Sequence, residues 1–338
     1  MDLETALARA LDARVPHLAP QHDGAIRLFA GFYEGFPPLA VDLYARTLVL
    51  HDYAEGPDGD RAAAERALRA ARERLPWIRA ALWKARNAAS PEARNGTPLL
   101  GTLRDLDRTI REDEVRYALS LAMHRDASFY LDTRALRAWA KRSLAGKRVL
   151  NTFAHTGSLG VAARAGGAAE VVHVDRNKAY LEIAKASYAK NGWPVRRVDF
   201  RAEDLFDAVG RLKREGALFD CVFVDPPVFS ETDRGKVDLV ASATRVLDKV
   251  RPLVGDGGAL VAVNNALFLP GKAFHDALEA MCADGYLAIE QLVPIPEDVR
   301  GFAATRVGAP PADPAPFEHA TKIAILRVKR KDGRRAAG

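Results

Sequence analysis

The chain has 338 residues, of which 48% are hydrophobic and 28% are charged, a composition typical of a globular protein with about two domains. Its longest apolar runs are far shorter than the ~20 residues that cross a bilayer, and residues 1–14 have the pattern of a charged amphipathic helix, not of a secretion signal. Cys221 and Cys282 are too few for a disulfide framework or a zinc cluster. These features exclude membrane-spanning and disulfide-rich secreted proteins, and they predict a cytoplasmic protein without a bound metal.

The charge balance is basic, because 50 Lys and Arg residues stand against 44 Asp and Glu residues and give a net charge of +6. A positive charge favours a polyanionic partner such as RNA, since binding releases counterions from the phosphates. Much of the excess is concentrated between Arg327 and Arg335. This segment is interpreted either as a solvated tail or as a contact for RNA, and charge alone does not separate the two.

The first 125 residues have the pattern of a small α+β module. After the first helix, a second helix is expected to begin after Asp60 and to end before Pro76. Residues 90–98 are expected to form a loop, and 114–122 alternate as in a half-buried strand. The other expected strands are 25–29, 39–44, 47–53 and 77–86.

From about residue 126 the pattern changes to alternating strands and helices. Nearly continuous apolar strands, such as EVVHVD, FDCVFVD and GALVAVNN, are separated by amphipathic helices, one of them expected over 238–254. This order predicts an α/β domain over residues 126–330, with a mostly parallel sheet covered on both faces, and a basic tail over 331–338. In such sheets, ligands bind beyond the carboxyl ends of the strands.

The first two strands of this sheet end in residues that suit a nucleotide-like cofactor. A helix begins in the turn from Asn151 to Gly160, where Gly157 lets the backbone approach a ligand and free N–H groups face an anion. The turn lacks the third glycine of the dinucleotide fingerprint, which argues against an NAD-dependent dehydrogenase. Asp175 ends the second strand, where its carboxylate can accept hydrogen bonds from ribose hydroxyls. A helix cap is the alternative role for Asp175.

The third and fourth strands also end in acidic side chains. Asp204 is placed to meet the amine of an adenine while Leu205 packs on the ring, with a helix cap again as the alternative. The fourth strand ends in FVDPPVFS, where two prolines without backbone N–H groups follow Asp225. Three acids at successive strand ends, together with the glycine turn, indicate a single site.

The motifs NTFAHTG, VHVD, AED and VDPPVFS, in this order and spacing, resemble those of class I S-adenosylmethionine (SAM)-dependent methyltransferases. More narrowly, they resemble the large-subunit ribosomal RNA methyltransferases. IRLF…LAVDLYARTLVLHDYA and SFYLDTR (128–134) extend the resemblance upstream, so that it covers about residues 25–270. The family implies a Rossmann-like domain with a mostly parallel, seven-stranded sheet, preceded by a small mixed β module.

The resemblance also implies the residues that hold SAM. The loop from Asn151 to Gly157 would hold the methionine part, Asp175 the ribose and Asp204 the adenine. SAM has no phosphates, its carboxylate suits helix N–H groups, and its sulfonium suits an acidic neighbourhood. The remaining residues assigned to the cofactor are Asp132, Arg134, Phe153, Thr156, Arg176, Leu205 and Asp225.

The Asp-Pro-Pro-aromatic motif resembles that of enzymes that methylate planar nitrogens of nucleobases. Pro226 and Pro227 stiffen the strand end and leave the Asp225 carboxylate and the Pro226 carbonyl as fixed acceptors. The ring of Phe229 is expected to stack on an extruded base. The alternative for Phe229 is a core aromatic beneath the loop.

The residues at the end of the next strand bear on the methylated atom. Methylation of cytosine C5 requires a cysteine thiolate, and Cys221 lies about 13 Å back along the strand from Asp225, at ~3.3 Å per residue. Cytosine-methylating relatives carry a Ser-Cys pair where this chain has Asn264-Asn265, which resembles the guanine-N7 branch. Guanine N7 carries a free lone pair and needs no general base, and Asn amides can pair with base edges. Turn formation is the alternative role of both Asn residues.

The sequence therefore predicts a SAM-dependent methyltransferase that acts on guanine N7 of large-subunit ribosomal RNA, with RNA as its partner and no membrane or metal. The alternatives are methylation of another nucleobase, including cytosine C5, or of a small molecule, and an RNA-binding or assembly protein with little catalysis. One departure from the guanine-N7 branch is the apolar segment 266–270, which replaces basic residues.

Overall fold

The computed structural model describes residues 2–56, 58–232 and 234–336. The chain forms two compact units, Met1–Asp132 with Pro296–Ala309, and Thr133–Ile295 with Pro310–Gly338. The first unit thus extends to residue 132 and also includes a segment from late in the chain. The sequence pattern did not indicate this late segment.

The first unit contains a five-stranded sheet in the order β1-β2-β3-β4-β5. Its strands are antiparallel neighbours except β3 and β4, which are parallel because the helix α3 (Arg61–Arg74) connects them. The Asp60 side chain accepts a hydrogen bond from the Ala63 N–H, as expected of the cap of α3. The strands are β1 (Ala25–Ala30), β2 (Leu39–Tyr44), β3 (Thr47–Asp52), β4 (Ala80–Ala85) and β5 (Thr97–Leu100), and α1 (Leu3–Arg14) packs beside α3.

In this unit one expectation was wrong, and another was correct only in part. The predicted loop over 90–98 contains the short helix α4 (Pro91–Asn95), because the Ser90 hydroxyl caps it at the Ala93 N–H, and β5 begins directly after it. The predicted strand 114–122 is limited to β7 (Val115–Ala118), which pairs only with β6 (Thr109–Glu112) as a hairpin outside the main sheet.

The late segment joins the first unit through buried polar contacts. It contains the helix α11 (Glu297–Arg300) and lies in the chain between the two stretches of the second unit. Arg14, fully buried, forms an ion pair with Glu34 at 2.9 Å and donates to the Asp298 carbonyl at 2.9 Å. The Asp298 carboxylate accepts the Arg27 N–H of β1 at 2.9 Å. Such contacts, between residues more than 270 positions apart, explain why the segment belongs to this unit.

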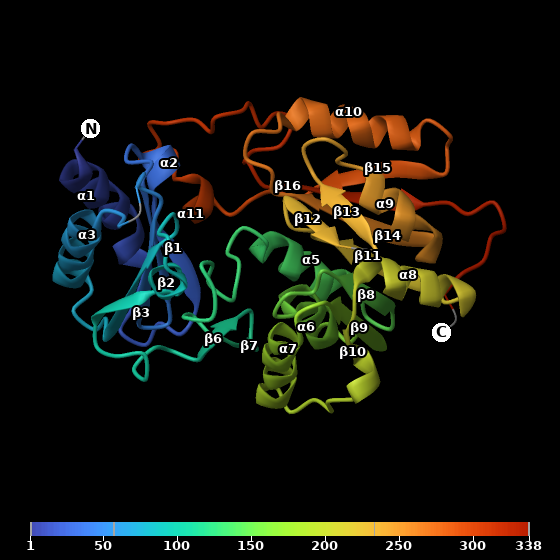
Figure 1. The fold of residues 1–338 in the computed structure, drawn as a ribbon, viewed down its shortest axis with the longest axis horizontal. Helices are drawn as coiled ribbons and strands as arrows, with labels where there is room; N and C mark the ends of the chain where they lie inside the picture. The colour runs from blue at the N-terminus through green and yellow to red at the C-terminus, as the bar shows by residue number, and fades with distance from the viewer. Residues whose placement is uncertain (1, 57, 233, 337–338) are drawn as a thin grey trace. The chain divides into compact units, whose positions relative to one another are not determined.

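The second unit contains a seven-stranded sheet in the order β10-β9-β8-β11-β14-β16-β15 (Figure 1). The first five strands in this order are parallel, and β16 and β15 are antiparallel to their neighbours. The fold class predicted from the alternating pattern is therefore confirmed. The strands are β8 (Arg148–Thr152), β9 (Glu170–Asp175), β10 (Phe200–Ala202), β11 (Phe219–Val224), β14 (Val254–Asn264), β15 (Leu287–Leu292) and β16 (Lys322–Val328).

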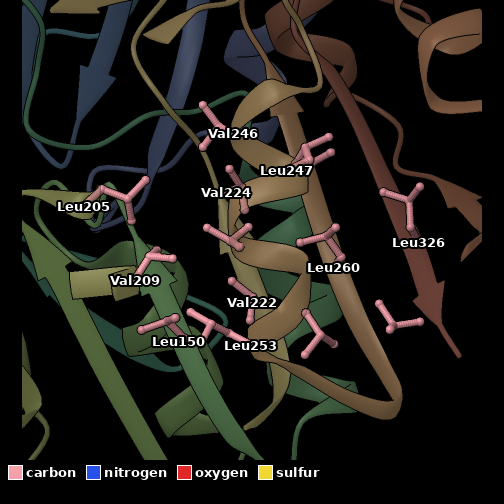
Figure 2. Packing of buried hydrophobic residues seen from close by; sticks show 14 of the residues in the cluster. Leu150, Leu205, Val209, Val222, Val224, Val246, Leu247, Leu253, Leu260 and Leu326 are labelled. Atoms are coloured by element: carbon pink, nitrogen blue, oxygen red, sulfur yellow. The ribbon is translucent and has the colours of Figure 1, made fainter. Parts of the chain in front are cut away.

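Helices cover both faces of this sheet. One face is covered by α8 (Leu205–Arg214), α9 (Arg245–Val250) and α10 (Gly271–Cys282). Apolar side chains of these helices form a buried cluster with alternate residues of the strands. Figure 2 shows Leu205, Val209, Val246 and Leu247 around Val222, Val224 and Leu260. On the other face lie α5 (Arg134–Ser143), α6 (Ser158–Ala165) and α7 (Lys178–Lys190), and Trp139 of α5 contacts Phe223 edge-on. Burial on both faces explains the continuous apolar strands.

The segment after β11 differs from the expectation. The predicted helix over 238–254 is present only as α9 and a 3₁₀ turn at Arg251–Leu253. It is preceded by a hairpin of β12 (Phe229–Thr232) and β13 (Gly235–Asp238). The Asp238 carboxylate accepts the N–H groups of Val240 and Ala241, and this local turn stops the helix from extending back. Among the described residues, no helix is long and apolar enough to cross a membrane.

Candidate functional site at the strand ends of the second unit

The loop after β8 is held in a tight conformation by Asp175. Phe153, His155 and Gly157 all have positive φ angles, of 48°, 48° and 80°. The Asp175 carboxylate accepts the backbone N–H of His155 at 2.7 Å and that of Asn177 at 2.8 Å. Burial raises the pKa of Asp175, although both N–H donors oppose this. Asp175 therefore ties the end of β9 to the loop after β8, while Asn177 caps α7.

A buried polar group lies beneath this loop and was missed by sequence reasoning. His173 of β9 is fully buried, with its ring nitrogens 3.4 Å from Asn151 Nδ2 and 3.2 Å from the Tyr188 hydroxyl. Its ring stacks on Phe200 at a centroid distance of 5.0 Å. Burial lowers the pKa of His173 to about 3, so the ring is neutral. A histidine inside the apolar run VVHV was the available signal in the sequence.

The two glycines of the loop are required by packing within the protein. A Cβ atom at Gly157 would lie 2.6 Å from Ala184 Cβ, and one at Gly160 would lie 2.4 Å from Cε1 of His173. Both distances are shorter than van der Waals contact. The absent side chains at Gly157 and Gly160 leave room for α7 and His173, and the close approach of a ligand to Gly157 stays a prediction. Asn151, predicted in the cofactor loop, is likewise buried and contacts His173.

At the end of β10, Asp204 has the alternative role that the sequence allowed. Its carboxylate accepts the Phe206 N–H at 2.8 Å and caps α8. This does not conflict with adenine binding, since a carboxylate has about four lone-pair sites. Leu205, predicted to pack on the adenine, is 6% exposed and belongs to the core cluster. The neighbouring Glu203 forms an ion pair with Arg211.

The Asp-Pro-Pro motif lies directly after β11. Asp225 is half-buried, Pro226 is buried, and Pro227 is exposed. Phe229 begins the β12–β13 hairpin and is 55% exposed, so it is not the core aromatic that the alternative interpretation required. The Lys236 ammonium lies 5.1 Å from the centroid of its ring. An exposed ring beside a cation is suited to stacking on a nucleobase.

The two Asn residues at the end of β14 have different environments. Asn264 is fully buried and hydrogen-bonded to backbone groups, donating to the Leu239 carbonyl and accepting the Ala266 N–H. These bonds are those of a turn-forming side chain, which favours the alternative role for Asn264. Asn265 is exposed at the same strand end. Of the pair, Asn265 is therefore placed to meet a ligand.

The remaining predicted cofactor residues lie on several elements. Thr156 is buried in the loop after β8, and Arg176 is exposed after β9. Asp132 is the last residue of the first unit, and Arg134 begins α5 in the second. Their assignment to the cofactor stays a prediction.

Neither cysteine is at a strand end. Cys221 is fully buried in the middle of the sheet, between Val149 and Ala259, and burial raises the pKa of its thiol far above the usual range. Cys282 ends α10, is partly buried, and also has a raised pKa because of burial. Neither thiol is poised to act as a nucleophile.

Three side chains on the outer face of α10 are close enough to share a metal ion. They are His275, Asp276 and Glu279, whose ligand atoms lie within 4.8 Å of one another. Asp276 is already paired with Lys272 at 2.7 Å. The group lies on a different element from the strand ends, and the prediction of a metal-free site stays a prediction.

Comparisons with known proteins show the family of the chain. A model of the protein family described as S-adenosylmethionine-dependent methyltransferase matches residues 84–299. The ribosomal RNA large subunit methyltransferase I of Serratia proteamaculans is 28% identical over 263 residues, which are 76% of this chain and 65% of that protein. The enzyme of the same name from Photobacterium profundum is 30% identical over 264 residues, 78% of this chain and 66% of that protein. This chain thus spans slightly less than two thirds of these relatives.

Solved structures share the fold. The methyltransferase-like protein SMU.776, crystallised with SAH, superimposes with a TM-score of 0.81 at 20% identity, covering 96% of this chain and 81% of that one. The tRNA m1G37 methyltransferase of M. jannaschii gives a TM-score of 0.54 at 15% identity, covering 88% and 72%. The names of the sequence relatives specify no base, so the comparisons give no support to the guanine-N7 branch. Because the family match covers most of the chain, the protein belongs to the S-adenosylmethionine-dependent methyltransferase family.

Proposed function

We propose that the protein transfers a methyl group from SAM to a nucleobase of large-subunit ribosomal RNA. The observation that carries this proposal is the sheet order β9-β8-β11-β14, which puts Asp175, the loop after β8, Asp225 and Asn265 at neighbouring strand ends. We call the ends of β8, β9 and β10 the cofactor half of the site, and the ends of β11 and β14 the acceptor half. The relatives named above support ribosomal RNA as the substrate.

The residues of the cofactor half fit SAM. The cap residue of α6 is Gly157, which has no side chain to bond the first N–H groups of the helix, so these groups suit the carboxylate of the methionine part. The Asp175 carboxylate uses its two oxygens for two backbone N–H groups and retains lone pairs for ribose hydroxyls. Bound SAM supplies an electrophilic methyl group on its sulfonium.

The residues of the acceptor half fit a flipped base. The rigid Pro226–Pro227 step fixes the Asp225 carboxylate, which accepts hydrogen bonds from base amines. Phe229 stacks on the base, a contact that contributes roughly 1–3 kcal/mol. Asn265 offers both a donor and an acceptor.

For the methylated atom, we propose a ring nitrogen, with guanine N7 as the first candidate. A ring nitrogen attacks through its own lone pair, so positioning alone is sufficient. Cytosine C5 would require a thiolate, and both cysteines of this chain are embedded in the fold. Cytosine is therefore the competing outcome of the test below.

The test is nucleoside mass spectrometry of ribosomal RNA from a strain that lacks the protein. We expect one methylated guanine to disappear, and to return with a plasmid that encodes the unaltered protein but not the Asp225→Ala variant. Loss of 5-methylcytosine would contradict the ring-nitrogen proposal. Full retention of every methylated base would contradict ribosomal RNA as the substrate, and absence of SAM binding in calorimetry would contradict the enzymatic function itself.

A further inference from the structure

The turn that follows β14 is fixed from both sides by buried side chains. The Asn264 Oδ1 atom accepts the Ala266 N–H at 3.0 Å. The Lys322 ammonium donates to the Ala266 carbonyl at 3.0 Å and also to the Ala320 carbonyl. Lys322 is the register partner of Asn264 across β14 and β16, and it is 1% exposed. Both polar groups of the Ala266 backbone are therefore held by side chains.

The same hydrogen bonds continue to the Asp-Pro-Pro motif. The Asn264 Nδ2 atom donates to the Leu239 carbonyl at 3.3 Å, and the Leu239 N–H donates to the Val228 carbonyl at 2.9 Å. Val228 directly follows the two prolines. We call this connected set the acceptor clamp: Lys322, Ala266, Asn264, Leu239 and Val228. It joins the start of β16, the end of β14 and the loop after β11.

Stability alone does not explain a lysine at this position. The four residues that follow Lys322 on β16 are apolar and buried, and removal of an ammonium from water has a large unfavourable free energy. Loss of hydration lowers the pKa of Lys322 to about 8. A well-packed apolar side chain is often as stabilising as a buried charge. What the ammonium adds is a fixed position for the Ala266 carbonyl.

We propose that Lys322 and Asn264 are positioning residues, which act through the acceptor clamp to hold Asn265 and the Asp225-Pro-Pro segment in the geometry that methyl transfer requires. This inference rests on the proposed function, and it assigns a task to two residues that do not touch the base. The clamp contacts no residue of the cofactor half among its hydrogen bonds. Loss of the clamp should therefore change the geometry of the acceptor half and leave SAM binding unchanged.

The test uses Lys322→Met and Asn264→Ala in the full chain, with ribosomal RNA from the deletion strain as substrate. We expect kcat to fall about 10- to 100-fold, because misplacement of reacting groups by about 1 Å has effects of this size. The Kd for SAM should change less than about twofold. The double variant should lose little more than either single variant, since residues of one network are not additive.

Lys84 provides a matched control in the first unit. It is also a buried strand lysine, and its ammonium donates to the carbonyls of Asn95 and His124. Lys84→Met makes the same exchange of a buried ammonium for an apolar side chain, so it shares any effect of that exchange on the melting temperature, but kcat should not fall. A fall of kcat in both variants that follows the loss of stability would overturn the proposal, and so would an unchanged kcat in Lys322→Met.

Hydrogen exchange gives a readout that does not depend on activity. In Lys322→Met, the amides of Ala266 and Leu239 should exchange faster than in the unaltered protein, while those of His155 and Asn177, held by Asp175, should not. Equal protection of Ala266 in both proteins would overturn the clamp. Failure of the clamp and failure of the proposed function give different results. If the proposed function is wrong, the unaltered protein itself will neither bind SAM nor methylate the RNA.

Discussion

The two halves of the site are built in opposite ways. In the cofactor half, a half-buried carboxylate, two glycines in close contact with their neighbours and a neutral histidine form a closely packed wall. In the acceptor half, large apolar side chains are exposed, with Phe229 at 55% and Phe268 at 73%. A packed wall suits a small ligand of fixed shape, whereas exposed rings suit a large partner that covers them on binding. The comparison predicts that substitutions in each half change different measured quantities.

The largest effect is expected from Asp225→Ala. Removal of the fixed acceptor should lower kcat about 100- to 1000-fold, the size seen when one positioned hydrogen-bonding group is lost from an active site. The Kd for SAM should rise only modestly. Asp207→Ala, which removes an exposed acid paired with Arg234, is the control and should have nearly full activity. Equal losses of kcat and SAM affinity in Asp225→Ala would remove the division into two halves.

Gly160→Ala should destabilise the packing between α6 and β9 in the cofactor half. Its Cβ would lie 2.4 Å from the His173 ring, so overpacking should lower the free energy of unfolding by about 2–3 kcal/mol. Gly210→Ala is the matched control, since its Cβ has no neighbour within 3.4 Å on the helix α8, and alanine there should stabilise slightly. Thermal unfolding measures both, and an unchanged melting temperature in Gly160→Ala would contradict the close packing.

Asp175→Asn should weaken SAM binding while kcat at saturating SAM changes little. We expect the Kd in calorimetry to rise about 10- to 100-fold, because a charged acceptor contributes roughly 1.5–3 kcal/mol to its hydrogen bonds. The amide keeps one acceptor oxygen, which limits the damage to the loop. A variant with unaltered Kd and reduced kcat would move Asp175 from the cofactor half to the acceptor half.

Phe229→Ala should raise the KM for RNA about tenfold and leave the melting temperature and SAM affinity unchanged, since its exposed ring contributes to stacking and not to the core. Phe229→Tyr should restore the KM. Val198→Ala, at a residue that is 67% exposed after α7, is the control for surface truncation. A lower melting temperature in Phe229→Ala would contradict the exposed placement.

The smallest effect concerns pH. The pKa of His173 is about 3 in the folded protein, whereas the ordinary value of 6.5 applies in the unfolded chain. Between these two pH values, the unfolded chain therefore binds a proton at His173 that the folded protein does not bind. The free energy of unfolding should therefore fall as the pH drops, by about 0.7 kcal/mol between pH 7 and pH 6 from this group. Denaturant unfolding of His173→Gln should lack this contribution. An identical pH dependence in both proteins would show that His173 binds protons equally in the folded protein and in the unfolded chain.

The sequence by itself determined the α/β fold and the place of the site, because βα repeats put all parallel strand ends at one edge. The same repeats put Asp175 and Asp225 at the ends of parallel strands. The β12–β13 hairpin was not predicted, since the turn at Asp238 competes locally with a helix of good apolar period.

Only the tertiary structure decided which of the predicted site residues are buried and which are exposed. Asn264 and Asn265 are equivalent in the sequence, yet one is bonded to Leu239, 25 positions away, and the other is exposed. The role of Lys322 depends on the carbonyl of Ala266, 56 positions away. Gly160 is required by His173 of the neighbouring strand. Contacts of this kind arise between segments distant in the chain, and a local pattern of residues carries no information about which distant partner fills the space beside them.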